Sequence, residues 1–229
     1  MLILNIETST DVGSVSLSRD GHCWILREDR ESGDHAKQLT IFIQEVLDAL
    51  SLSLNDIDAL ALSTGPGSYT GLRIGASVAK GICYTLQKPL IAVDTLKAMA
   101  YGVQLLENPG QNDIIISVQD ARRMDAYAAV YSADLETLRA PFFLTLEADS
   151  FADMMPDGAR IFVCGNAAEK WSSLLSNPSI VFSSVKMPSS RFMEKISYEM
   201  YNANQFEDYA YYEPFYMKPP NVTIPKNLI

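Results

Sequence analysis

The predicted order of strands and helices recurs in the two halves of the chain, and this recurrence limits the possible folds more than any other feature. The first half opens with three strands at residues 2–6, 12–18 and 23–27. Apolar residues recurring every three or four positions then predict a helix over residues 36–50. This half continues with a strand at 58–63, a helix at 71–86, a strand at 90–93 and a helix at 95–106.

The second half repeats this order in a less regular form. It has strands near residues 114–118, 126–131, 138–144, 161–164 and 180–182, and helices near 168–175 and 190–202. A segment rich in turn residues at 108–112 is the best boundary, so we expect one domain at 1–108 and a smaller one at 109–229. Two α/β halves of similar order predict a duplicated fold with a cleft between the halves.

The charge of the chain disfavours direct binding to nucleic acid. The 229 residues carry a net charge of −10, and residues 1–110 alone hold 8 basic and 13 acidic side chains. Nucleic-acid binding depends on Lys and Arg neutralising phosphates. We therefore expect any contact with RNA to be made through a partner.

The cysteines and the apolar segments point to a cytoplasmic protein. Cys23, Cys83 and Cys164 are far apart and odd in number, which indicates neither a disulfide framework nor a metal site. The first residues lack the basic start of a signal peptide. No apolar stretch approaches the roughly 20 residues that span a bilayer, so we expect no membrane association.

The segment Ser-Thr-Gly-Pro-Gly-Ser-Tyr-Thr-Gly-Leu-Arg-Ile-Gly at residues 63–75 joins a predicted strand to a helix. Free N–H groups at a helix N-terminus can bind an anion. The segment lacks the Gly-Lys-Ser/Thr ending of a P-loop, and its glycine spacing is one residue too long for a dinucleotide fingerprint. A phosphate cradle and a tight turn with close packing both remain open.

The helix after this segment is apolar on most faces and carries small residues at every fourth position. Such a helix must be buried on more than one side. It could lie between the chain's own sheet and first helix, or part of it could meet another protein. The residues of the two helices that we consider as a partner interface are His35, Leu39, Ile43, Val46, Gly71, Leu72, Gly75, Ala79 and Cys83.

Two polar segments are weaker candidates for a binding site. Glu7, Thr8, Ser9 and Thr10 place a carboxylate and three hydroxyls at the end of the first strand, and Asp120 follows the first strand of the second half. These groups suit phosphate or metal-bound water. They suit an ordinary strand-to-turn transition equally well, because Ser, Thr and Asp bond to nearby backbone in turns.

The histidines predict no catalytic site. His22 and His35 are the only two, and the fourth residue after His35 is Leu39. A His-x-x-x-His metal pair is therefore missing, and no Gly-x-Ser-x-Gly elbow supports a serine triad. We predict no catalytic residue and no metal site in this chain.

Four segments, taken in order, resemble the TsaB (YeaZ-like) proteins: Ile-Glu-Thr-Ser-Thr at 6–10, the glycine-rich stretch at 65–75, Asp-Ala-Arg at 120–122 and Glu-Pro-Phe-Tyr at 213–216. The resemblance covers essentially the whole chain. It implies a duplicated actin/Hsp70/sugar-kinase-like fold, with two α/β domains that each have a mixed β-sheet flanked by helices. It also implies a role in threonylcarbamoyl transfer to the adenosine beside the anticodon of tRNA, with a catalytic paralogue, TsaD, and an ATPase, TsaE.

The same resemblance implies an accessory rather than a catalytic subunit. TsaD proteins hold a metal through two histidines four residues apart on the first helix, whereas this chain has His35 and Leu39. Glu7 replaces the aspartate usual at the end of the first strand, so Glu7, Thr8, Ser9, Thr10 and Asp120 are interpreted as degenerate phosphate-binding positions.

We accordingly expect no cofactor in the isolated chain, a homodimer when the partner is missing, and contact with tRNA only through the complex. A nucleotide at an interface of the complex stays open. The alternatives are an ATP-binding kinase or ATPase of the same fold and a glycoprotease-like (M22) peptidase.

Overall fold

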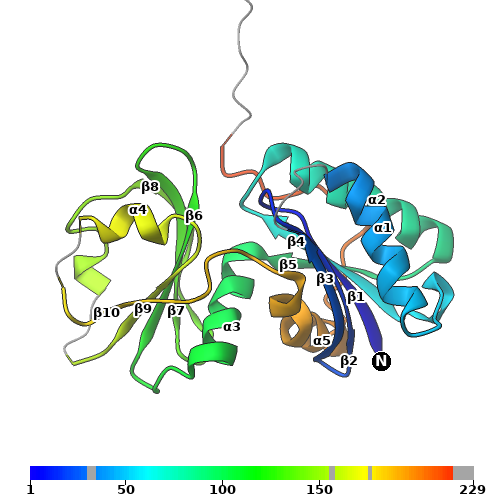
Figure 1. The fold of residues 1–229 in the computed structure, drawn as a ribbon, viewed down its shortest axis with the longest axis horizontal. Coiled ribbons are helices and arrows are strands. Elements are labelled where there is room, and N and C mark those ends of the chain that lie inside the picture. The colour runs from blue at the N-terminus through cyan, green and yellow to red at the C-terminus, as the bar shows by residue number, and fades with distance from the viewer. Residues whose placement is uncertain (30–34, 155–157, 175–176, 219–229) are drawn as a thin grey trace, which may run out of the picture.

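The chain forms two lobes that lie side by side, each built on a five-stranded sheet flanked by helices (Figure 1). The computed structural model describes residues 1–29, 35–154, 158–174 and 177–218, without the side chains of residues 35–37 and 153. None of the helices within these ranges combines the length and the apolar character needed to cross a membrane.

The first sheet has the strand order β3-β2-β1-β4-β5. Its strands are β1 (Leu2–Glu7), β2 (Gly13–Arg19), β3 (His22–Asp29), β4 (Ala59–Gly65) and β5 (Leu90–Asp94). β1 runs antiparallel to β2 and parallel to β4, so the sheet is mixed. Leu4 in the central strand lies between Leu17 and Leu60 of its two neighbours.

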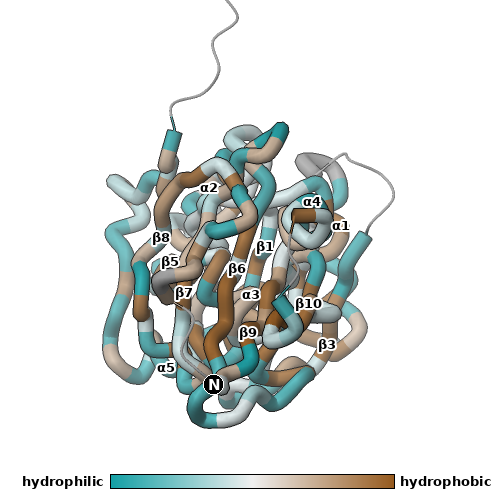
Figure 2. The backbone as a smooth tube through the Cα atoms, turned by 90° about the vertical axis from the view of Figure 1, so that its left-hand side faces the viewer, coloured by the Kyte–Doolittle hydropathy of each residue, from teal (hydrophilic) through white to brown (hydrophobic). Residues whose placement is uncertain are grey.

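Two helices cover one face of this sheet. They are α1 (His35–Asp48) and α2 (Tyr69–Leu86), and a short 3-10 turn, η1 (Leu54–Asp56), lies between them in the chain. The core under the two helices joins Leu4, Ile6 and Leu17 of the strands to Ile43 and Ala79 of the helices. Figure 2 shows hydrophobic residues along the central strands of the molecule, β6 among them.

The second sheet has the order β10-β9-β6-β7-β8, which is the same topology as that of the first sheet. Its strands are β6 (Ile114–Asp120), β7 (Asp125–Ser132), β8 (Thr137–Thr145), β9 (Ile161–Cys164) and β10 (Ile180–Phe182). On its outer face, α4 (Ala168–Ser172) and η2 (Ala152–Met154) lie over a core that contains Phe151 and Trp171. α4 ends at Ser172, earlier than the predicted helix 168–175.

A third core joins the lobes through α3 (Thr95–Glu107). This core contains Ile91 and Val93 of the first sheet and Ile115 and Phe162 of the second. η3 (Ser190–Met193) and α5 (Glu194–Asn202) return from the second half of the sequence and also pack on the first sheet. The expected division of the chain at residue 108 stays a prediction, and it falls at Asn108, the residue directly after α3.

The expected fold class is confirmed. Each lobe has a mixed five-stranded sheet with helices on its faces, and the two sheets share one strand order. The first three strands of each half are consecutive in the chain and pair antiparallel. The fourth strand pairs in parallel with the other edge of the first strand. This is the duplicated actin/Hsp70/sugar-kinase-like arrangement that the resemblance implied.

The small residues of α2 face the chain's own sheet, which is one of the two alternatives that the sequence left open. A Cβ atom at Gly71 would fall on the carbonyl oxygen of Thr8, and one at Gly75 would fall on the hydroxyl of Thr8. The other candidate interface residues of the two helices are also buried within the chain: Leu39, Ile43, Val46, Leu72, Ala79 and Cys83. The side chain of His35 lies outside the described residues.

Replacing Gly71 with Ala should destabilise the protein by roughly 1–3 kcal/mol or more, because the new methyl group meets backbone that cannot move without displacing β1. Urea unfolding followed by circular dichroism measures this change. Gly81→Ala in the same helix is the matched control. A Cβ at Gly81 meets nothing within 4 Å, so this variant should gain up to about 1 kcal/mol in helix propensity. Equal stability of the two variants would contradict the packing described here.

Candidate functional site

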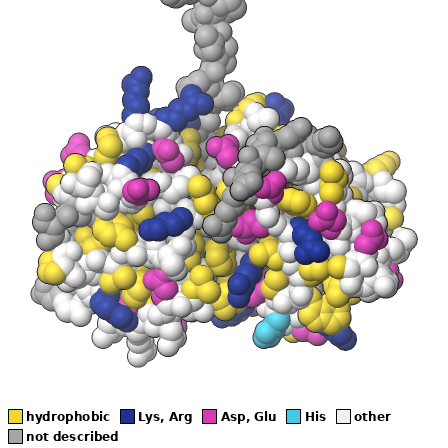
Figure 3. Space-filling model, viewed as in Figure 1, with side chains coloured by type: hydrophobic (Ala, Val, Ile, Leu, Met, Phe, Trp, Pro, Cys, Tyr) yellow, Lys and Arg dark blue, Asp and Glu magenta, His cyan; other side chains and the backbone are white. Residues whose placement is uncertain are grey.

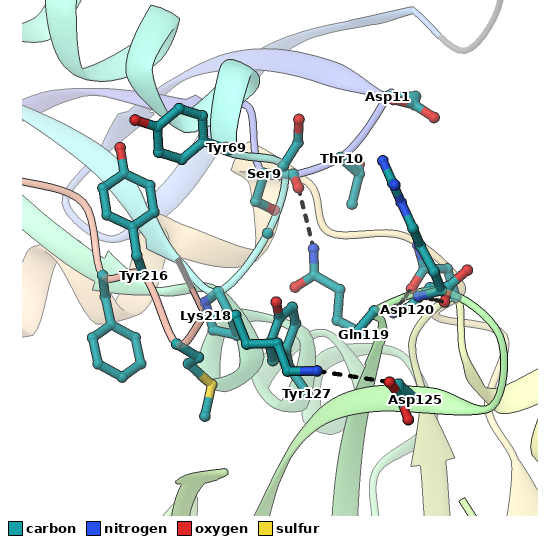
Figure 4. Close-up of a pocket in the computed structure, with 18 of the residues that line it drawn as sticks. Ser9, Thr10, Asp11, Tyr69, Gln119, Asp120, Asp125, Tyr127, Tyr216 and Lys218 are labelled. Atoms are coloured by element: carbon teal, nitrogen blue, oxygen red, sulfur yellow. Dashed lines mark hydrogen bonds and ion pairs between the residues drawn. The ribbon is translucent and has the colours of Figure 1, made fainter. Parts of the chain in front are cut away.

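A cleft of about 930 Å³ lies where the two lobes meet. Its walls come from corresponding turns of the two lobes, namely the β1–β2 turn with the start of α2, and the β6–β7 turn (Figure 4). The last described residues, Phe215 to Lys218, complete the lining. The duplication of the fold therefore places two equivalent turns face to face.

The first wall is built by a close contact between the β1–β2 turn and the loop before α2. Ser68 N donates to the carbonyl oxygen of Ser9 at 2.6 Å, and the hydroxyl of Ser68 accepts from Gly71 N at 3.3 Å. A Cβ at Gly67 would overlap the backbone of Ser9, so only glycine allows this approach. The first turn of α2 holds no acidic residue and lies at the cleft.

The second wall is the turn of residues 120–125, which Lys170 of α4 holds in place. The Lys170 ammonium donates to Asp120 Oδ1 at 2.8 Å and to the carbonyl oxygens of Arg123 and Asp125. Arg122 and Arg123 have φ angles of 74° and 52°, a left-handed conformation that is unusual for residues other than glycine. Backbone strain of this kind gathers at functional sites. The turn is thus anchored at its base and presents two consecutive arginines at the cleft.

Gln119 forms the floor of the cleft between the two walls (Figure 4). Its side chain is 2% exposed, and its Nε2 donates to the carbonyl oxygen of Ser9 at 3.2 Å. Because a carbonyl oxygen can only accept, this bond fixes the orientation of the amide. The Oε1 atom of Gln119 has no hydrogen-bond partner among the described residues.

The C-terminal segment brings aromatic rings and a lysine to the cleft. Phe215 N donates to the carbonyl oxygen of Thr64 at 2.7 Å, which places the segment beside the end of β4. The ring of Tyr216 lies 4.9 Å from that of Tyr69. Lys218 Nζ lies 3.7 Å from Asp125 Oδ2, so the segment reaches from the first lobe to the second.

The structure brings together some of the polar residues selected from the sequence and separates others. Ser9, Thr10 and Asp120 line the cleft. Thr8 lies behind the wall, against the glycines of α2. The interpretation of Glu7, Thr8, Ser9, Thr10 and Asp120 as degenerate phosphate-binding positions stays a prediction, because no ligand contact tests it.

Glu7 also lies behind the wall. Its side chain is fully buried, and its carboxylate accepts from Ser9 N. Burial raises the pKa of Glu7 above its ordinary value of 4.5, against the opposing effect of hydrogen bonds from Ser9, Ser63 and Thr8. Burial therefore makes the charged form of this carboxyl group less favourable than it is in water.

Several cleft residues were not selected from the sequence: Tyr69, Gln119, Arg122, Arg123 and Lys218. The two arginines lie in a turn in which the sequence predicts only Asp120 as a binding position, although Arg122 belongs to the Asp-Ala-Arg motif at 120–122. Their consecutive positions in a turn were the available signal, but solvated charges are common in turns. Gln119 is the penultimate residue of a buried strand, and its sequence context carries no sign of a site.

The cleft combines groups that bind anions with groups that bind a polar, aromatic molecule. Arg122 and Arg123 supply positive charge, and the start of α2 supplies backbone N–H groups. Tyr69, Tyr127 and Tyr216 supply aromatic surface. Among the residues that the structure describes, no three His, Cys, Asp or Glu side chains gather as a metal site would require.

The proteins to which the chain is similar carry names from tRNA modification. The family model described as "TsaD: tRNA N6-adenosine threonylcarbamoyltransferase" matches residues 30–223. The tRNA threonylcarbamoyladenosine biosynthesis protein TsaB of Escherichia coli strain K12 is 38% identical over 136 residues, covering 58% of this chain and 56% of that protein. The protein of the same name from Haemophilus influenzae is 35% identical over 127 residues, covering 56% of this chain and 52% of that protein.

These matches have limits in length and in identity. The chain spans only about half the length of the curated relatives, 56% and 52% for the first two. Among solved structures, YeaZ from Pseudomonas aeruginosa superposes with a TM-score of 0.81, covering 94% of this chain and 99% of that one. Its sequence identity is 22%, so this likeness establishes the fold alone.

Replacing Glu7 with Gln should change how stability depends on pH. Because the pKa of Glu7 is raised in the folded state, the folded chain keeps a proton that the unfolded chain releases above pH 4.5. The stability due to Glu7 is thus fully present below pH 4.5 and is lost as the pH rises through the raised pKa. Gln mimics the neutral form, so the variant should gain in free energy of unfolding relative to the parent as the pH rises from 4 to 8.

Urea unfolding at several pH values measures this difference. Glu136→Gln, at an exposed glutamate between β7 and β8, is the control and should follow the pH dependence of the parent. A parent and a Glu7→Gln variant with parallel curves would mean that Glu7 ionises in the folded protein without a penalty.

Proposed function

Since the chain belongs to the tRNA N6-adenosine threonylcarbamoyltransferase (TsaD) family and is TsaB/YeaZ-like, we propose that it is an accessory subunit of threonylcarbamoyl transfer to tRNA. Its partners would be a TsaD-like catalytic paralogue and a TsaE-like ATPase, and the target would be the adenosine beside the anticodon. The observation that carries the proposal is the 38% identity to a TsaB biosynthesis protein over 136 residues.

The positions of two carboxylates support a non-catalytic role. Glu7 is enclosed in the first lobe and does not line the cleft. Asp120 lines the cleft, but its Oδ1 accepts from Lys170 Nζ and from Arg122 N, at 2.8 and 2.7 Å. A kinase or ATPase of this fold would need carboxylates free to act on a metal or a nucleophile, and here both are engaged by their own chain.

The outer side of α1 and α2 is the surface that we propose for the partner. The inward residues of both helices pack on the sheet, so contact with a partner falls to the outward ones. Ile41 on α1 is 44% exposed, and Ile74, Val78 and Ile82 of α2 are half-buried. Gly81 is exposed with open space beyond its Cα, which allows a second helix to come close.

The distribution of charge supports contact with tRNA through the complex. On the face shown in Figure 3, basic side chains are interspersed with acidic ones and form no continuous patch. The net charge of −10 repels a polyanion. The isolated chain should therefore bind tRNA weakly at physiological salt.

The proposed role predicts a specific effect of charge on the outer surface of α1. Ile41→Lys places a charge on an apolar interface, and the affinity for the TsaD-like paralogue should fall by about tenfold or more, equivalent to ~1.4 kcal/mol. Leu138→Lys on β8, where Leu138 is 49% exposed, is the matched control and should bind like the parent. Affinity is measured by calorimetry with the purified paralogue, and threonylcarbamoyladenosine in tRNA by mass spectrometry of cells complemented with each variant.

Two outcomes would separate the parts of this proposal. Full modification with Ile41→Lys and unchanged affinity would remove the outer side of α1 from the interface. Cells that lack the chain but keep normal threonylcarbamoyladenosine would contradict the accessory role itself.

The proposed role also predicts that the purified chain hydrolyses neither ATP nor peptides. The reason is that Glu7 is enclosed and Asp120 is bound by Lys170. Steady-state assays with ATP and magnesium, and with a labelled protein substrate, measure both activities. Turnover that disappears in the Asp120→Asn variant would favour the kinase or peptidase alternative.

A further inference from the structure

We propose that residues 207–218 form a strap that limits the rotation of the two lobes about α3. The strap is built into the first lobe along most of its length, and Lys218 at its end fastens it to the second lobe. The proposal concerns the chain by itself and does not depend on the accessory role.

The strap begins at β5, the edge strand of the first sheet. Glu207 N donates to the carbonyl oxygen of Leu90 at 2.8 Å, so the strap pairs with this edge. Lys80 of α2 donates to the carbonyl oxygens of Ala210 and Tyr212, both at 3.1 Å. The side chain of Tyr212 is buried in the core beneath α2. The first half of the strap is therefore a fixed part of the first lobe.

The second half of the strap follows the end of β4 to the cleft. Phe215 N donates to the carbonyl oxygen of Thr64 at 2.7 Å. A Cβ at Gly65 would lie 2.7 Å from the carbonyl oxygen of Phe215, so only glycine allows the strap to come this close. The ring of Tyr216 lies 4.9 Å from the ring of Tyr69. These contacts position the strap before it leaves the first lobe.

Lys218 joins the strap to the second lobe through two contacts. Its ammonium lies 3.7 Å from Asp125 Oδ2 and 3.2 Å from the centroid of the Phe143 ring. An ammonium group is attracted to the face of an aromatic ring. Thr145 of β8 donates to Asp125 Oδ1 at 2.7 Å, which holds the carboxylate in place on β7. The second lobe thus offers Lys218 a site that its own sheet keeps in position.

The position of the strap determines which motion it opposes. Two α/β units that share one interface commonly move relative to each other. Figure 1 shows α3 at the bottom between the lobes and the last described residues of the strap at the top, where the cleft lies. Rotation about α3 that opens the cleft would pull Lys218 away from Asp125. The strap therefore favours the arrangement in which the lobes are close together.

The contact of Lys218 with the second lobe is sensitive to salt. The side chains of Lys218 and Asp125 are 45% and 31% exposed, so ions in solution reach the pair. The Debye length falls from about 10 Å at 0.1 M salt to about 3 Å at 1 M, which is shorter than the 3.7 Å between the two groups. High salt should therefore weaken the contact and allow the cleft to open further.

Distances between spin labels on the two lobes test the proposal, measured on the full chain by double electron–electron resonance. Ser77→Cys on α2 and Ala148→Cys after β8 place the labels at exposed positions outside the strap. Cys23→Ser removes the partly exposed native thiol, and Cys83 and Cys164 are buried. At about 0.1 M salt the parent should show one dominant short distance.

Lys218→Ala should raise the population of longer distances by about threefold or more, because both contacts of the ammonium are lost. Lys218→Arg keeps a cation at the same place and should behave like the parent. Lys195→Ala is the matched control, because Lys195 is also 45% exposed and forms an ion pair within α5. Raising the salt to about 1 M should shift the parent toward the distances of Lys218→Ala and change that variant little.

Three results would overturn the proposal. The first is a Lys218→Ala variant with the distance distribution of the parent at low salt. The second is a Lys218→Arg variant with the distances of Lys218→Ala, since the contact would then not depend on the positive charge. The third is an equal response to salt in the parent and in Lys218→Ala. Circular dichroism of each variant checks that the distances come from folded protein.

Discussion

The carbonyl oxygen of Ser9 is the point on which the arrangement of the two lobes around the cleft depends. It accepts from Ser68 N of the first lobe at 2.6 Å and from Gln119 Nε2 of the second lobe at 3.2 Å. The first bond needs the backbone of the α2 loop to touch the β1–β2 turn, which only the missing side chains of Gly67 and Gly71 permit. The second bond sets the floor of the cleft and the direction of the Gln119 amide. One acceptor therefore connects a glycine-dependent contact, the junction of the lobes and the geometry of the candidate site.

The contact at Ser9 is supported by a core that the two lobes share. α3 lies between the sheets, η3 packs on β2, where Ser14 is buried, and α5 packs on β1 and β5. Burial of hydroxyl groups is tolerable when they are hydrogen-bonded. Ser190 N donates to Ser14 Oγ at 2.9 Å, and Ser197 Oγ bonds to Asn5 Oδ1 at 2.8 Å. The returning segment thus adds polar bonds and apolar packing to the same face, which keeps the first wall in a fixed place relative to the second.

The two lobes have the same strand topology, but the walls that they contribute to the cleft differ in the kinds of side chain they present. The wall of the first lobe is made of hydroxyls, glycines and the N-terminus of α2, and its strand-end carboxyl, Glu7, is enclosed, so that burial raises its pKa. The wall of the second lobe presents Arg122 and Arg123 beside Asp120 and Asp125, and Lys170 holds it in a strained conformation. A site of this kind can hold an anion in place but offers no free carboxylate at the end of the first strand. This agrees with the accessory role proposed for the chain.

The sequence by itself determined the elements, their order and the duplication, because the spacing of apolar residues and the turn residues act over a few neighbouring positions. It also indicated that the small residues of α2 allow close packing, without telling whether the chain or a partner supplies the other surface. Tertiary structure decided that Thr8 and the first sheet fill that place, that Glu7 lies behind the wall, and that residues 190–218 return to the first lobe. It also brought Gln119 and Arg122 of the second lobe opposite Ser9. These outcomes depend on contacts between residues more than 50 positions apart. The spacing of neighbouring residues does not specify which distant surfaces come into contact.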